Sequence, residues 1–137
     1  MDSKTLRVLE FNKIIDMLRQ YAASDLGKAI VDDLKPSTDI NEITLNQKET
    51  SEAVSMILKK GSLGLGGLRS VEEYIKRVNV SGVLNIEELI KIGDFLRVSR
   101  RARDYAKSES KNDSFPILEP QFNSIVSVND LEREIER

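Results

Sequence analysis

Apolar residues recur along the chain at spacings of three and four, which is the period of helices that bury one face. The first such stripe consists of Phe11, Ile14, Ile15, Leu18, Tyr21 and Ala22. The preceding segment, residues 6–9, fits either the start of this helix or a short extended arm. Ser24 can cap a second helix, which we expect to end before Pro36 because a proline disfavours helical geometry in the residue before it. This helix would bury Leu26, Ile30 and Leu34.

A long helix is predicted to begin after Asp39, which has Glu42 three residues later, as in a capping box. Positions spaced by three and four form a seam along this helix: Ile40, Ile43, Gln47, Thr50, Val54 and Ile57. Such a seam is typical of a helix packed on another helix. Because a polar side chain is costly to bury without a hydrogen bond, Gln47 and Thr50 indicate that this stretch is half exposed or faces a partner.

Glycines interrupt the helical pattern at residues 61–67, and we expect a loop over residues 61–69. Ser70 and Glu73 then predict a capping box for a short helix. Asn85 and Glu88 have the same spacing and open a second long helix, which runs towards residue 105.

Polar residues return at 107–114, where the composition predicts a second loop. A short helical turn that re-enters the core is indicated by Phe122, Ile125 and Val126. Asn129 is expected to cap a last, charged helix that starts at Leu131. The apolar side of this helix breaks off after two turns, so we expect the chain to be truncated at residue 137 and to be a segment of a longer protein.

These patterns together predict an all-α fold, an irregular helical bundle of about five or six helices, two of them long. Aromatic residues make up only 5% of the chain, so the core would consist mainly of aliphatic side chains. No apolar run reaches the roughly 18 residues needed to cross a bilayer, and the first residues lack an apolar signal core. We therefore expect a cytoplasmic protein that does not contact a membrane.

The chain of 137 residues contains no His and no Cys. It therefore has no imidazole base, no thiolate nucleophile and none of the usual zinc or haem ligands. Its acidic pairs, at residues 32–33, 72–73 and 87–88, lie in single helical turns where adjacent side chains diverge. The glycine-rich loop lacks the Gly-Lys-Ser/Thr sequence of a P-loop. We expect no catalytic residue, no cofactor and no metal in this chain.

The sharpest charge feature is the segment 97–107, where five cations and one anion give a local charge of +4 in a chain of net charge −2. The cations are Arg97, Arg100, Arg101, Arg103 and Lys107. On a helix the first three share a face and the last two form a second pair. The segment could bind a nucleic-acid backbone, or it could be a solvated face whose cations favour the carboxyl end of a helix. The sequence leaves both interpretations open.

Several short motifs, in their order and spacing over nearly the whole chain, resemble the amino-terminal end of the second type of bacterial MutS protein, the MutS-II family. The motifs include Thr5-Leu6-x-x-Leu9-Glu10-Phe11-x-Lys13-Ile14, Ser24-x-x-Gly27-Lys28, Leu34-x-Pro36, Gln47-x-Glu49-Thr50-x-Glu52-Ala53, Leu65-Gly66-Gly67-Leu68-Arg69 and Leu96-Arg97-x-Ser99-Arg100. One departure is Ser70, where the family has an acidic residue. Either residue type can cap a helix.

The resemblance implies that residues 1–137 are the amino-terminal helical part of a larger protein. That protein would have a MutS-like core and lever region, a P-loop ATPase that binds ATP and Mg²⁺ and forms a homodimer, and a carboxyl-terminal Smr nuclease domain. None of the ATPase or nuclease motifs lies in this chain. The partners implied are the remainder of the same polypeptide, branched or mismatched DNA, and the ribosome or its RNA.

The resemblance favours a non-catalytic role in coupling the ATPase dimer to DNA binding, in suppression of homologous recombination and in rescue of stalled ribosomes. An alternative is an independent helical module that binds nucleic acid, or that dimerises, through the basic face of the helix at 97–107. Charge reversal at the arginines tests whether this face binds nucleic acid. Measurement of the oligomeric state tests whether the module dimerises.

Overall fold

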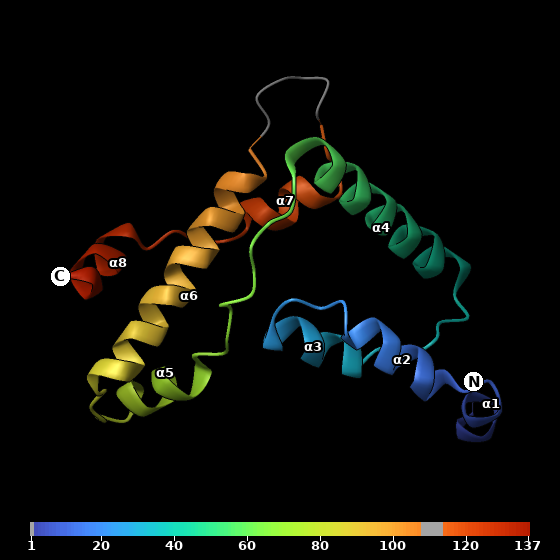
Figure 1. Ribbon diagram of the computed structural model, residues 1–137, viewed down its shortest axis with the longest axis horizontal. Coiled ribbons are helices and arrows are strands. Elements are labelled where there is room, and N and C mark those ends of the chain that lie inside the picture. Colours follow the sequence, from blue (N-terminus) through green and yellow to red (C-terminus); the bar gives the residue numbers. More distant parts are fainter. Residues whose placement is uncertain (1, 108–113) are drawn as a thin grey trace.

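The computed structural model describes residues 2–107 and 114–137, and these residues form eight α-helices and no strand (Figure 1). The helices are α1 (Ser3–Val8), α2 (Phe11–Arg19), α3 (Asp25–Asp32), α4 (Ile40–Lys60), α5 (Glu72–Asn79), α6 (Ile86–Tyr105), α7 (Leu118–Asn123) and α8 (Asn129–Glu136). The all-α prediction is confirmed, although the expected number of five or six helices is too low. The two long helices, α4 and α6, are the two that the sequence predicts.

The first additional helix is α1, which covers the segment that was compatible with a helix start or an extended arm. It is separate from α2 because Glu10 adopts a left-handed conformation, with φ of 55°. A non-glycine residue rarely has this geometry, and it turns the chain between two helices. The Glu10 side chain also pairs with Lys13 at 2.9 Å in the first turn of α2.

The long helices form two arms that converge near α7, as Figure 1 shows. Helix α5 lies beside the first turns of α6, and α8 packs along the same long helix. Helices α1 to α3 contact one another in sequence and lie across the open side of the two arms. The chain therefore has an arched arrangement in which most helices touch one or two neighbours.

The best-packed region is the junction where α4, α6 and α7 meet. Met56 and Phe115, each 2% exposed, and Leu118 form its centre, with Ala53, Tyr105 and Phe122 packed around them. Lys60 ties the two arms together, because its ammonium group donates to the carbonyl oxygens of Tyr105 at 2.9 Å and Lys107 at 2.8 Å. These carbonyl groups at the end of α6 have no partner within the helix, so the lysine acts as its cap.

The seam predicted along α4 is wrong about which face is packed. Ile40, Val54 and Ile57 on that seam are exposed, and so are Gln47 and Thr50. Exposure was expected only around the two polar residues, but much of the seam is exposed. The packed face lies on α4 from Glu49 onward, because the short helix α7 contacts that part of α4.

The predicted helix ends are confirmed in three cases. At the start of α4 the Asp39 carboxylate accepts the N–H groups of Asn41 at 2.9 Å and Glu42 at 3.3 Å. The Ser24 hydroxyl accepts the N–H of Gly27 at 3.0 Å, and α3 ends at Asp32, before Pro36. Asn85 and Glu88 form a reciprocal capping box at the start of α6. The expected burial of Ile30 and Leu34 is wrong, since they are 68% and 43% exposed and α3 packs mainly against α2.

Two other predicted caps do not form. Val71, not Ser70, occupies the capping position of α5, and the Ser70 hydroxyl makes only a long contact of 3.4 Å with the N–H of Glu72. Helix α8 already includes Asn129 and follows Val128. The loop expected at 61–69 is confirmed, whereas most of the loop expected at 107–114 lies outside the described residues.

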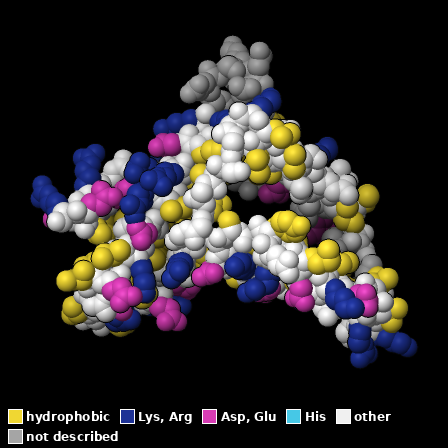
Figure 2. Space-filling model, in the orientation of Figure 1, with side chains coloured by type: hydrophobic (Ala, Val, Ile, Leu, Met, Phe, Trp, Pro, Cys, Tyr) yellow, Lys and Arg dark blue, Asp and Glu magenta, His cyan; other side chains and the backbone are white. Residues whose placement is uncertain are grey.

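The chain exposes much more surface than a compact protein of its size. Its accessible area is 10,477 Å², whereas a compact monomer of this mass exposes about 7,200 Å². Many large apolar side chains contribute to the excess, and Figure 2 shows them along α4 and around the end of α6 that carries α5. In the described part of the chain, no helix is long and apolar enough to cross a membrane.

Candidate nucleic-acid interface

The cationic segment predicted from the sequence occupies the second half of α6 and the residue pair that follows it. The capping box at Asn85 starts the helix, and its cations lie towards the carboxyl end, where the helix dipole favours positive charge. Val98 and Ala102, which lie among these cations in the sequence, are buried.

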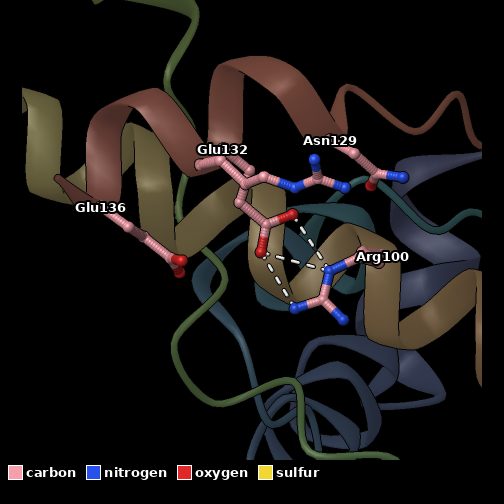
Figure 3. A pocket seen from close by; sticks show the side chains of 5 residues that line it. Arg100, Asn129, Glu132 and Glu136 are labelled. Atoms are coloured by element: carbon pink, nitrogen blue, oxygen red, sulfur yellow. Dashed lines mark hydrogen bonds and ion pairs between the residues drawn. The ribbon is translucent and has the colours of Figure 1, made fainter.

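Arg100 and Glu132 form the most extensive ion pair of this helix. Arg100 Nε lies 3.2 and 3.0 Å from the two carboxylate oxygens of Glu132, and Nη2 lies 3.0 Å from Oε1. Figure 3 shows the guanidinium group of α6 pointing to the carboxylate of α8. The Glu132 side chain is 6% exposed and that of Arg100 is 40% exposed. The pair therefore links α6 to α8 at one edge of their contact.

The charge state of Glu132 follows from its surroundings. The hydrogen bonds from Arg100 lower the pKa of the Glu132 carboxyl group, while burial acts in the opposite direction. The charges of Arg97 and Arg101 lower this pKa further. Glu132 is thus a carboxylate at neutral pH, held in the combined field of three arginines.

The other four predicted cations differ from Arg100 in the partners that they contact. Arg97 pairs with Asp94 one turn earlier, and Lys107 Nζ lies 3.0 Å from Asp104 Oδ1, which lowers the pKa of the Asp104 carboxyl group. Arg103 donates to the Ser127 hydroxyl at 3.2 Å. Arg101 is exposed and has no ion-pair partner within residues 2–107 and 114–137.

The structure thus brings the five predicted residues onto one helix and its end but leaves only Arg101 without a carboxylate or hydroxyl partner in the described chain. Sequence reasoning missed Glu132 and Ser127, the partners that follow the second loop. The amphipathic pattern of the last helix was visible, but a pair separated by 32 residues leaves no local signal of its own.

The other features considered for chemistry do not form a site. Among the described residues no three acidic side chains are grouped so as to hold a metal ion. Glu72 pairs with Lys76 one turn later in α5, whereas Glu88 of α6 pairs with Arg77 of α5. An apolar groove of about 540 Å³ opens beside the junction of α4 and α7, and it is lined mainly by Met56, Ile57, Leu63, Leu65, Phe122 and Ile125.

Comparison with known proteins identifies relatives of the chain, although no protein-family model matches it. It is 43% identical over 136 residues to "Endonuclease MutS2" of Clostridioides difficile (strain 630), an alignment that covers 98% of this chain and 17% of that protein. It is 37% identical over 136 residues to the protein of the same name from Alkaliphilus oremlandii, with 99% and 17% covered. Identity to that of Acetivibrio thermocellus is 44% over 109 residues, with 80% and 14% covered.

The resemblance to the MutS-II family read from the sequence motifs is confirmed. The chain is homologous over nearly its whole length to a segment of endonuclease MutS2 proteins. It spans about one sixth of the length of these relatives, 17% of the first two.

Proposed function

We propose, from this homology to a segment of MutS2 proteins, that the chain is a non-catalytic structural part of a larger DNA-related protein of the same type. Residues 1–137 would form the amino-terminal part of its helical core in the cytoplasm. In this role the chain contributes to the core that couples an ATPase dimer, with bound ATP and Mg²⁺, to branched or mismatched DNA. The biological outcomes would be suppression of homologous recombination and rescue of stalled ribosomes.

The observation that carries this proposal is the excess of exposed surface. An open arch with 10,477 Å² of accessible area leaves apolar faces in water that a self-sufficient domain would bury. Leu58, Val83 and Ile86 are each more than three quarters exposed. Burial of such side chains is the main favourable term in folding. The relative from Clostridioides difficile is about six times as long as this chain, and in a protein of that length the remaining polypeptide would offer the complementary surface.

Hydrogen exchange tests this structural role. The amides of residues 40–58 in α4, where the predicted seam is exposed, are compared in the isolated chain and in the complete protein. We expect slower exchange in the complete protein, because another segment covers the seam. Equal protection in both would refute the packing proposed for α4. Residues 115–118, which are packed in the chain itself, serve as the internal reference.

A second candidate function is direct nucleic-acid binding by the basic face of α6. The observation in its favour is Arg101, an exposed cation without an ion-pair partner in the described chain and next to Arg97 and Arg100. Phosphate contacts by arginine release counterions, so the affinity should fall as salt increases.

The test is a titration of the chain with branched DNA and with RNA at two salt concentrations, together with the Arg101→Glu variant. We expect binding at low salt that weakens in the variant. A matched control is Arg7→Glu, which makes the same charge change in α1, at the far end of the chain. No binding at low salt, or equal binding by both variants, would exclude this second function.

A further inference from the structure

We propose that Arg100, with Arg97 and Arg101 beside it, forms a phosphate site on α6, and that Glu132 of α8 occupies this site as an intramolecular competitor. The ligand class is the phosphodiester backbone of nucleic acid. The inference rests on the second candidate function, binding by the basic face, and adds to it a means by which binding is held back.

The geometry of the Arg100–Glu132 pair supports this assignment. Nε and Nη2 of the guanidinium group meet both oxygens of the carboxylate at 3.0 to 3.2 Å. This two-pronged arrangement is the one by which arginine binds either a carboxylate or two oxygens of a phosphate. The donor groups that a phosphate would use are therefore already oriented, and Glu132 accepts from them.

The three arginines around Glu132 are suited to a ligand that carries more than one negative charge. Arg97 and Arg101 act on the carboxylate without contacting it within ion-pair distance. Both oxygens of the Glu132 carboxylate already accept from Arg100, so Glu132 has no additional oxygen for Arg97 or Arg101. A nucleic-acid backbone carries successive phosphates and can therefore use Arg100 and Arg101 together.

The pocket at this pair has room for such an exchange. It is an opening lined by Arg100, Asn129, Glu132, Arg133 and Glu136. In Figure 3 Arg100 points to Glu132, and Asn129 and Glu136 lie to either side along α8. Arg133 adds a cation to the same opening. Glu132 is the main cause of the raised pKa of Arg100, and the charges of Asp104 and Glu136 raise this pKa further. Both of these carboxylates would repel an incoming anion.

The position of α8 is set by its packing on α6. The helix has eight residues, and Leu131 on its apolar side remains 47% exposed. Besides the Glu132 pair, its contact with α6 includes Ile135, which sits close to Gly93.

The test uses the whole chain and a short labelled DNA duplex as the probe. In Glu132→Gln the competing charge is removed while the side chain keeps its size. We expect the duplex to bind about fivefold to tenfold more tightly than to the unaltered chain at low salt. The salt dependence should also steepen, by about one unit in the slope of log K against log salt, because Arg100 now contacts a phosphate.

The control variant is Glu134→Gln, which makes the same change of net charge on the same helix at a side chain that is 73% exposed and pairs with Arg137. It should leave the salt slope unchanged. In the double variant Glu132→Gln with Arg100→Gln, the gain in affinity should disappear. Equal binding by Glu132→Gln and Glu134→Gln, or a gain that survives loss of Arg100, would overturn the proposal.

A measurement on the unaltered chain covers the case in which Glu132→Gln fails to fold. Saturating duplex should speed hydrogen exchange of the α8 amides, because the phosphate displaces Glu132 and loosens the helix. Unchanged or slower exchange in α8 would overturn the competition. If the duplex still binds and Arg101→Glu abolishes that binding, the basic face stands as a binding surface and only the competition by Glu132 is refuted.

Discussion

The carboxylate of Glu52 in α4 accepts the backbone N–H of Ile117 at 2.8 Å, so a side chain of one helix caps another whose N-cap residue lies 65 residues later. The same carboxylate accepts the N–H of Leu118 at 3.0 Å, and Glu49, one turn earlier, accepts from the amide of Gln121 at 3.1 Å. Helix α7 has no cap from its own N-cap residue, Ile117. The acidic residues of the motif at 47–53 thus hold α7 against α4.

Replacing Glu52 by alanine should destabilise the chain by about 1.5–3 kcal/mol, because amides that lie in a partly buried junction lose a charged acceptor. Urea unfolding followed by circular dichroism measures the change. Glu49→Ala is the control, since its bond to the exposed Gln121 side chain contributes less. A loss for Glu52→Ala no larger than for the control would contradict this role of Glu52 as a cap.

Phe115→Ala should cost about 3–5 kcal/mol, because it removes the largest fully buried side chain of the junction and leaves a cavity between α4 and α7. Leu58→Ala should change stability by much less, because the Leu58 side chain on α4 is 81% exposed. Thermal unfolding of the two variants gives the comparison. Similar losses would show that this junction is not the centre of the folded chain.

Ser24→Ala should destabilise by about 1 kcal/mol, because the first turn of α3 loses the hydroxyl that accepts the Gly27 N–H. Ser55→Ala, at an exposed position inside α4, should be neutral or slightly stabilising because alanine favours helices more than serine does. Hydrogen exchange at the first amides of α3 locates the effect. Protection there that is unaffected by Ser24→Ala would contradict the prediction.

The contact between α6 and α8 should weaken in acid. Arg100 holds the pKa of Glu132 below its ordinary value of 4.5, so the folded state favours the carboxylate. Its stabilising contribution is therefore complete above about pH 5 and is lost as the pH falls through the lowered pKa. The difference in stability between the unaltered chain and Glu132→Gln should be constant near neutrality and shrink below pH 4.5. A difference that does not vary with pH would contradict the ion pair.

Local signals predicted the helices and some of their ends. Asn85 and Glu88 determine a cap within three residues, and Ser24 does so with its own next turn, so the sequence alone was sufficient at both places. The left-handed Glu10 was not predicted, because a non-glycine residue gives no local sign of this conformation.

Which face of a helix is packed could not be read from its own period. On α4 the apolar seam is regular, yet the packed side is the one that meets α7, a helix that lies beyond residue 115. The local composition identified the basic residues of α6, but it did not identify the residues with which they pair. Arg100 is paired because α8 returns alongside α6, and this return depends on the path of the whole chain.

The junction at Lys60 and Phe115 acts as the vertex of two rigid arms. Helices α4 and α6 have 21 and 20 residues, so each arm is about 30 Å long. A rotation of about 10° at the vertex would move the far end of an arm by about 5 Å, a shift comparable to one helical turn. Small changes in packing around Phe115 would therefore be magnified at the distant ends of the arch, where α5 and the segment before α4 lie.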